Sequence, residues 1–204
     1  MLVLDQALKI YIKTHFILGE EYRIAPWFII HFTENNGMAF GMELSGQYGK
    51  IFLSIFRIAA IILIGYYLQT LVKRKAHWGL ICSFALIFAG ALGNIIDSAF
   101  YGMLFSDSGY EVSKFLPKEG GYAGFLHGKV VDMFYFPLIE GHFPSWVPFW
   151  GTEEFLFFRP VFNVSDSAIT VGVVLILLFQ KKFYPKVEEG EKNNSPDTTP
   201  NSVQ

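Results

Sequence analysis

Cysteine is almost missing from this chain, and so is an excess of charge of either sign. The single cysteine, Cys82, lies within an apolar run, so no intrachain disulfide can form. Lys and Arg together number 16 and Asp and Glu 18, which leaves a net charge of −2. This balance gives no indication of a nucleic-acid partner or an anionic substrate. The chain also lacks the internal repeat that many membrane carriers show.

Apolar residues, in contrast, are abundant. Of the 204 residues, 52% are hydrophobic and 22 are Phe, and the mean hydropathy is +0.35. Soluble domains have an apolar share of roughly 45–50%, even with Gly counted. The composition therefore indicates one integral membrane domain, which we place at residues 1–186. Residues 187–204 are polar and lack aromatic side chains, which predicts a disordered tail.

Four apolar segments predict a bundle of four transmembrane helices, at about 1–18, 51–72, 79–101 and 162–182. The basic clusters Lys73-Arg74-Lys75 and Lys181-Lys182 belong in the cytoplasm by the positive-inside rule. Both termini are then cytoplasmic, and segments 19–50 and 102–161 lie outside. We expect a mainly α, integral membrane fold with a small extracytoplasmic β-sheet and a long extracytoplasmic connection.

The first segment is a poor span by itself, because Asp5, Lys9 and Lys13 share one helical face. One interpretation is an amphipathic helix on the membrane surface. The other is the outer half of a spanning helix whose apolar first half is absent from this sequence. A start four residues before a buried-type Asp favours the second interpretation.

Residues 22–50 hold aromatic and β-branched residues, followed by the turn signal Glu34-Asn35-Asn36-Gly37. This pattern predicts a β-hairpin or a small sheet outside the bilayer. Asn-Gly turns are common, so the pattern alone does not indicate a function.

Gly90, Gly93, Asn94 and Asp97 form a small and polar stripe along the third expected span. Small residues let helices approach closely, and Asn can bond across helices, so a packing seam explains most of the stripe. A seam does not explain Asp97, whose ionised form needs a partner or water. A functional face is the second interpretation.

Asp166 lies inside the fourth apolar segment, where a carboxylate at mid-membrane costs about 2.5–3.5 kcal/mol. It shares a helical face with Asn163 and Thr170. Asn163 also suits an N-cap with Asp166 as the third helical residue, which resembles a capping box. Capping and catalysis are compatible, and the helix dipole would favour an ionised Asp166.

Asp132 is flanked by Val130, Val131 and Met133, which favour an extended segment over a turn. In the expected topology it lies on the same side of the membrane as Asp166. Because no Cys or Ser–His pair stands out as a nucleophile, the two carboxylates suggest a dyad. One would take a proton from water while the other, protonated, polarises the scissile carbonyl. The residues do not say which one holds the proton.

Five motifs lie in order over most of residues 1–183: Asp5-Gln6-x-x-Lys9, Asn35-x-Gly37-x-Ala39-Phe40, Gly90-Ala91-Leu92-Gly93-Asn94-x-x-Asp97, Val130-Val131-Asp132 and Phe162-Asn163-x-x-Asp166. Each is weak alone. Together, on a matching four-span topology, they resemble the type II, or lipoprotein, signal peptidases of bacterial inner membranes.

This resemblance implies a membrane-embedded aspartic endopeptidase with Asp132 and Asp166 as catalytic residues. It implies cleavage just before the diacylglyceryl-modified cysteine of prolipoproteins, at the outer face of the inner membrane. The substrate and membrane lipids are the implied partners, without metal, cofactor, nucleic acid or oligomer. The positions that would bind substrate or support the site are Asn35, Gly37, Gly90, Asn94, Asp97, Asn163, Asp5 and Lys9.

The chain departs from the family pattern at Ser98, where the family commonly has Arg. We hypothesise that Arg57, the only arginine within an expected span, supplies this cation. Alternatively, Arg57 snorkels to the interface. The family's first helix also usually begins well before its Asp-Gln pair. The 102–162 connection is longer than the family minimum, and the extra length has no assigned function.

Two other functions compete with a peptidase. A small proton- or ion-coupled transporter would also carry intramembrane Asp and Asn residues. The carboxylates, however, cluster at one face instead of forming a relay through the bilayer. A purely structural subunit would use them to lock helices together, and Asp132 would then be dispensable.

Overall fold

The computed structural model describes residues 1–36, 47–137, 139–142, 154–157 and 160–184. The helices are α1 (Leu2–His15), α2 (Gln47–Lys73), α3 (Trp78–Ile96), the π-helix η2 (Asp97–Tyr101), α4 (Gly102–Leu104), α5 (Val164–Leu178) and α6 (Gln180–Phe183). The strands are β1 (Glu21–Ala25), β2 (Phe28–Asn35), β3 (Val130–Tyr135), β4 (Ile139–His142) and β5 (Glu154–Phe157).

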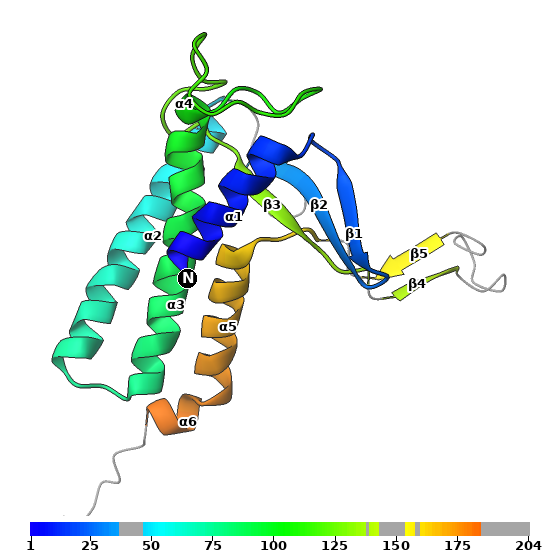
Figure 1. Ribbon diagram of the computed structural model, residues 1–204. Helices are drawn as coiled ribbons and strands as arrows, with labels where there is room; N and C mark the ends of the chain where they lie inside the picture. Colours follow the sequence, from blue (N-terminus) through cyan, green and yellow to red (C-terminus); the bar gives the residue numbers. More distant parts are fainter. Residues whose placement is uncertain (37–46, 138, 143–153, 158–159, 185–204) are drawn as a thin grey trace, which may run out of the picture.

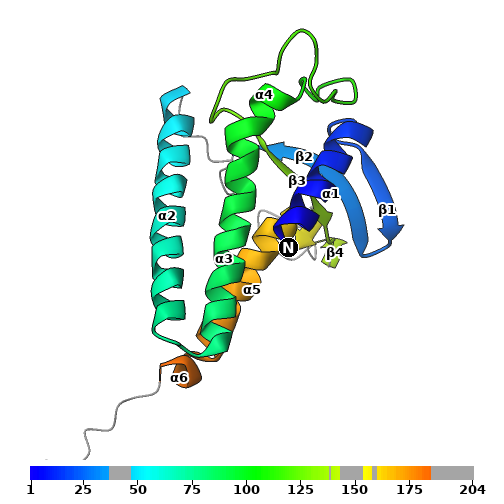
Figure 2. The ribbon, with the colours of Figure 1, turned by 60° about the vertical axis from the view of Figure 1, so that its left-hand side comes forward.

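The long helices α2, α3 and α5 stand side by side, with the sheet beside one half of the bundle (Figures 1 and 2). Within the part of the chain that the structure describes, two segments, Ile51–Lys73 and Trp78–Leu104, are long and apolar enough to cross a membrane. They coincide with the second and third expected spans. α5 is apolar but has 15 residues. α1 has 14 residues, or about 21 Å of helix, against the ~30 Å of a hydrocarbon core.

α1 carries its charges inward and its apolar side chains outward. Asp5, Lys9 and Lys13 have no exposed surface, whereas Val3 is 83% exposed. A helix lying on a membrane surface would instead turn its charged face to water. The surface-helix interpretation of this segment is therefore wrong, because the charged face packs against α3, α5 and the sheet.

The small residues expected on the third span form a close seam between α3 and α5. A Cβ added at Gly90 would overlap the backbone carbonyl of Ser165, and one at Gly93 would overlap its hydroxyl. From the other helix, a Cβ at Gly172 would lie 2.6 Å from the carbonyl oxygen of Ser83. The packing interpretation of the glycines is thus confirmed.

β1, β2 and β3 form an antiparallel sheet in that order, as expected for the outer segment. The hairpin turns at Pro26-Trp27, and β2 continues through Glu34 and Asn35. The turn expected to begin at Glu34 is therefore wrong in its first two residues. β2 extends this far because it also pairs with β3, a partner more than 90 residues later that no local signal reveals.

The end of β2 pairs Thr33 with Asp132, Glu34 with Val131 and Asn35 with Val130. Opposite residues of an antiparallel pair share a face, and successive residues alternate between faces. Asn35 and Asp132 therefore lie on one face of the sheet and Glu34 on the other.

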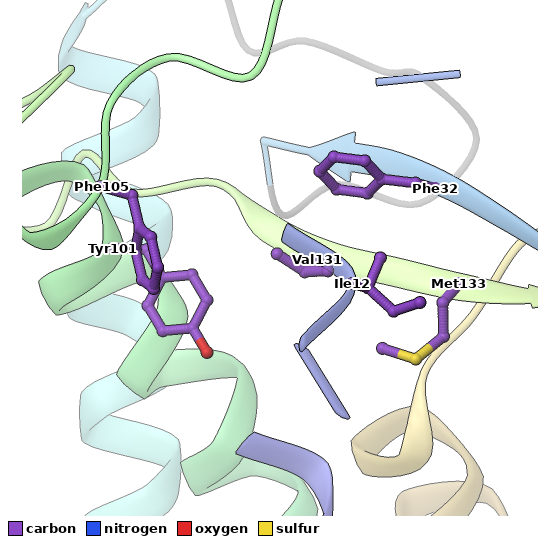
Figure 3. Packing of buried hydrophobic residues seen from close by; sticks show 6 residues of the cluster. All are labelled: Ile12, Phe32, Tyr101, Phe105, Val131 and Met133. Carbon is purple, nitrogen blue, oxygen red and sulfur yellow. The ribbon is translucent and has the colours of Figure 1, made fainter. Parts of the chain in front are cut away.

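An apolar cluster joins α1, the sheet and the end of the bundle formed by η2 and α4 (Figure 3). Its buried members are Ile12, Phe32, Tyr101, Phe105, Val131 and Met133. The cluster fixes β3 against α1, so the strand that carries Asp132 is held from the face opposite to that carboxylate.

The long connection returns to the end of α3. The helix continues through η2 and α4 to Leu104, and the following chain packs back on it. The amide of Gly128 donates to the carbonyl of Ser98 at 2.8 Å, and Ala123 donates to Gly102 at 2.9 Å. A Cβ at Gly128 would overlap the carbonyl oxygen of Asp97, so this approach requires glycine. The expected extended segment around Asp132 follows as β3.

Candidate active site

The first turn of α5 places two site residues by a local rule. Asn163 is the N-cap: its side-chain oxygen accepts from the amide of Asp166 at 2.9 Å. In return, the amide of Asn163 donates to Asp166 Oδ2 at 3.3 Å, which completes a capping box. The predicted cap is confirmed. Reciprocal bonds of this kind hold a carboxylate at the positive end of the helix dipole.

Asn163 also reaches the second carboxylate. Its side-chain nitrogen lies 2.7 Å from Asp132 Oδ1, 3.2 Å from the carbonyl oxygen of Val131 and 3.2 Å from Asn94 Oδ1. One buried amide side chain therefore contacts Asp132 and holds the turn that carries Asp166. The two aspartates, expected on the same side of the membrane, are neighbours across Asn163.

Asn94 on α3 connects this pair to α1. Its side-chain nitrogen donates to Asp166 Oδ1 at 2.8 Å, and its oxygen accepts from Lys9 Nζ at 2.8 Å. An amide with its oxygen turned to a cation and its nitrogen to an anion has both groups satisfied. The polar member of the stripe thus serves the site as well as the seam.

Lys9 is the buried cation at the centre of α1's contribution. Its Nζ lies 3.1 Å from Asp5 Oδ2 and 2.8 Å from Asp97 Oδ2. Asp5 in turn accepts from the amide of Ser165 at 2.8 Å, and Asp97 from the amide of Val131 at 3.3 Å. These bonds tie α1, η2, β3 and α5 to a single charged centre. Lys9 is thus the charged partner that Asp97 needs and that the packing-seam interpretation did not explain.

Gln6 and Tyr101 belong to the same network, although the sequence did not identify them as site residues. Gln6 Nε2 donates to Asp97 Oδ1 at 2.9 Å and to Asp5 Oδ2 at 3.1 Å. The hydroxyl of Tyr101 donates to Gln6 Oε1 at 3.1 Å. Gln6 could have been predicted from the sequence, because it lies directly beside Asp5. Nothing local marks Tyr101.

Burial and a like charge act together on Asp132. Removal from solvent and, to a lesser extent, the charge of the nearby Asp166 raise the pKa of Asp132 to about 7. Hydrogen bonds from Asn163 and Asn35, and the charge of Lys9, oppose it. A buried carboxyl group whose pKa is raised next to a second carboxyl group is an arrangement found in acid–base pairs.

Four positions considered in the sequence analysis remain: Asn35, Gly37, Ser98 and Arg57. Asn35 lies at the end of β2 and reaches Asp132, while Gly37 lies outside the described residues. Ser98 donates to the carbonyl of Asn94 within its own helix at 3.1 Å, so it does not replace a cation. Arg57 on α2 interacts electrostatically with Asp166 and Asp132, and its role as the replacing cation stays a hypothesis.

The sequence also matches a family model. Residues 1–181 match the model described as signal peptidase (SPase) II. The chain belongs to the signal peptidase II family. A lipoprotein signal peptidase of Porphyromonas gingivalis is 50% identical over 203 residues, which cover 99% of this chain and 88% of that protein. One of Amoebophilus asiaticus is 37% identical over 181 residues, covering 86% and 72%.

Solved structures agree with this membership. A bacterial membrane enzyme structure determined by the in meso method has a TM-score of 0.58 and 26% identity, and covers 93% of this chain and 89% of that one. Signal peptidase II proteins are membrane peptidases, so this family member is a peptidase built on apolar helices with a small antiparallel sheet. The network around Lys9, Asn94 and Asn163 is the place in the fold where such chemistry can be located.

Proposed function

We propose that this signal peptidase II is an aspartic endopeptidase that removes the signal peptide from diacylglyceryl-modified prolipoproteins. Its catalytic residues are Asp132 and Asp166. The observation that carries the proposal is the shared contact at Asn163, which bonds to Asp132 and caps the turn that holds Asp166. Two carboxylates held by one side chain can share a single proton and activate water between them.

The two aspartates have different roles in this proposal. Asp132, buried and with a raised pKa, holds the proton and donates a hydrogen bond to the scissile carbonyl oxygen. Asp166, at the helix N-terminus and bonded by Asn94, is the carboxylate that removes a proton from the attacking water. The water oxygen bonds to the carbonyl carbon, and the proton taken by Asp166 passes to the leaving amine. The C–N bond then breaks, and the proton balance of the pair is restored.

The substrate and its orientation follow from the family and the topology. The cut lies just before the lipid-modified cysteine, and the lipid chains stay in the bilayer beside the apolar helices. The basic residues after α2 and in α6 are on the cytoplasmic side, so the sheet and the site are at the outer face of the inner membrane. Asn35, Gly37, Gly90, Asn94 and Asp97 position substrate or support the dyad, with Asp5 and Lys9 behind them.

Cleavage of a lipid-modified prolipoprotein by the purified protein tests the proposal. The wild type should yield the shortened product, and Asp132→Asn and Asp166→Asn should each fold and bind substrate without yielding it. We expect a loss of at least about 1,000-fold in kcat, because each change removes a group used in general acid–base catalysis. Ser167→Ala is a matched control on the same helical turn. Normal cleavage by either Asn variant would refute the dyad, and binding without cleavage by the wild type would favour a carrier.

A further inference from the structure

A second buried charged cluster lies on the face of the sheet opposite to the site. Lys13 on α1, with no exposed side-chain surface, forms an ion pair with Glu34 on β2, whose side chain is 2% exposed. Ser108 bonds to both: its hydroxyl lies 2.6 Å from Lys13 Nζ and donates to Glu34 Oε1 at 2.8 Å. Lys129 Nζ lies 3.1 Å from Glu34 Oε2. We call these four residues the Glu34 cluster.

Aromatic rings close the cluster on its remaining sides. Lys13 Nζ lies 5.5 Å from the ring centre of Phe105 and 5.0 Å from that of Tyr122, and Lys129 Nζ lies 5.4 Å from Tyr122. Burial alone would raise the pKa of Glu34, but Lys13, Ser108 and Lys129 together hold it below its ordinary value. Glu34 is therefore an anion, and three separate parts of the chain converge on it.

Stability alone does not explain this cluster. Charges withdrawn from water lose solvation that their mutual attraction only partly returns, and an apolar pair of similar volume is often as stable. The best-attested benefit of a buried polar contact is that it allows one register and excludes others. The question is then which register depends on Glu34.

The pairing of β2 with β3 gives the answer. The ladder is irregular between Ile30 and Thr33 and resumes for three pairs, in which Glu34 faces Val131. Three pairs hold a register weakly, and a slip by one residue moves every side chain to the other face. A slip of β2 would bring Asn35 into the cluster and Glu34 into the site.

The neighbour of Glu34 makes this register important. Asn35 lies on the face of Asp132 and hydrogen-bonds to it, as Asn163 does. We propose that Glu34 is a positioning residue, whose cluster holds β2 in the register that keeps Asn35 beside Asp132. Glu34 itself touches neither aspartate, and it acts through Asn35. The activity test of this inference rests on the proposed function, whereas the register can be measured without it.

Kinetics separate a positioning role from a structural one. Lys13→Met leaves Glu34 without its main partner and should impair folding and cleavage together. Lys13→Met/Glu34→Leu removes both charges at similar volume and should recover the wild-type Tm. We expect this folded double variant to keep the wild-type KM and to lose roughly 100-fold in kcat, the usual effect of a small misplacement at a reacting centre. A double variant with wild-type kcat would overturn the proposal.

A matched control lies on the same sheet. Glu21 on β1 and His31 on β2 form a partly exposed contact, with Glu21 Oε1 3.0 Å from His31 Nδ1. Glu21→Gln should leave kcat and KM unchanged. If the double variant does not fold, Ser108→Ala is the alternative test. It keeps the charges of Lys13 and Glu34 and removes one hydrogen bond to each. It should lower kcat at constant KM, and a change in KM alone would contradict the proposal.

Cross-linking reads the register directly. In a Cys82→Ser background, Asn35→Cys/Val130→Cys places two cysteines at facing positions, about 4.5–5.5 Å apart at Cα, where a disulfide can form. Oxidation should link this pair and not Asn35→Cys/Val131→Cys. When Lys13→Met/Glu34→Leu is added, the disulfide yield of Asn35→Cys/Val130→Cys should fall and that of Asn35→Cys/Val131→Cys should rise. Unchanged yields overturn the inference even where cleavage is confirmed. A shifted register in a protein that cleaves no prolipoprotein would refute the proposed function alone.

Discussion

At the scale of single residues, the two aspartates differ because their surroundings differ. Asp132 is 4% exposed on a strand packed from behind by apolar side chains. Asp166 is the third residue of a capping box and accepts a bond from Asn94. The sequence indicated this difference through the apolar flanks of Asp132 and the cap at Asn163. It could not assign the proton, because that depends on burial.

The pH dependence of cleavage follows from this assignment. In the proposed mechanism the active form holds the proton on Asp132, whose pKa is raised to about 7. As the pH rises through that value the proton is lost, so kcat should fall about tenfold per pH unit well above it. A pH–rate profile at saturating substrate measures this limb. A rate that increases steadily from pH 6 to pH 9 would contradict the assignment.

Arg57 provides a second residue-scale prediction. Its guanidinium interacts electrostatically with Asp166 and Asp132. Arg57→Gln should keep the fold, lower kcat roughly tenfold, equivalent to about 1.4 kcal/mol, and move the high-pH limb upward, because Asp132 loses a nearby cation. Arg74→Gln, after α2 at the other end of the bundle, is the control. Unchanged folding, cleavage and pH profile in Arg57→Gln would end the hypothesis.

At the scale of elements, the site depends on how closely α3 approaches α5 and α1. A methyl group at Gly93 would overlap the hydroxyl of Ser165 and lie 2.8 Å from Asp5 Oδ2. Gly93→Ala should therefore cost about 1–3 kcal/mol of stability and reduce cleavage, because Asp5 orients Lys9. Thermal unfolding in detergent and the cleavage assay measure both effects. Gly124→Ala, whose added Cβ meets nothing within 4 Å, should change neither.

Helices were easier to predict from the sequence than strand pairing. The spans at 51–72 and 79–101 were indicated by long apolar runs, and the seam by its glycines. The turn expected at Glu34 was wrong because β3, which extends β2, lies far along the chain. The network around Lys9 was hard to predict for the same reason. Apart from Asp5, which the spacing within α1 indicated, its members lie on α3, η2, β3 and α5. Long-range partners are set by packing, which one sequence does not display.

At the scale of the whole molecule, the orientation of the helix bundle in the membrane determines on which side the substrate binds. The basic residues at one end of the bundle predict that this end is cytoplasmic. In a Cys82→Ser background, Lys118→Cys in the outer connection should react with a membrane-impermeant maleimide in intact cells. Arg74→Cys should react only after permeabilisation. Labelling in the reverse order would invert the topology and place the sheet inside.

The fully buried Lys9 has a consequence for how the protein is made. Its helix α1 is synthesised before the elements it binds: Asn94 and Asp97 come with α3 and η2, and Ser165, which holds Asp5, comes with α5. A growing chain completes domains from its N-terminus onward. Here, however, α1 cannot complete its contacts until α5 has been made. Asp132 and Asp166 acquire their common contact at Asn163 only when α5 docks. If Asp132 and Asp166 carry out the proposed cleavage, a chain from which α5 is still missing is inactive, and proteolysis begins only once α5 has docked.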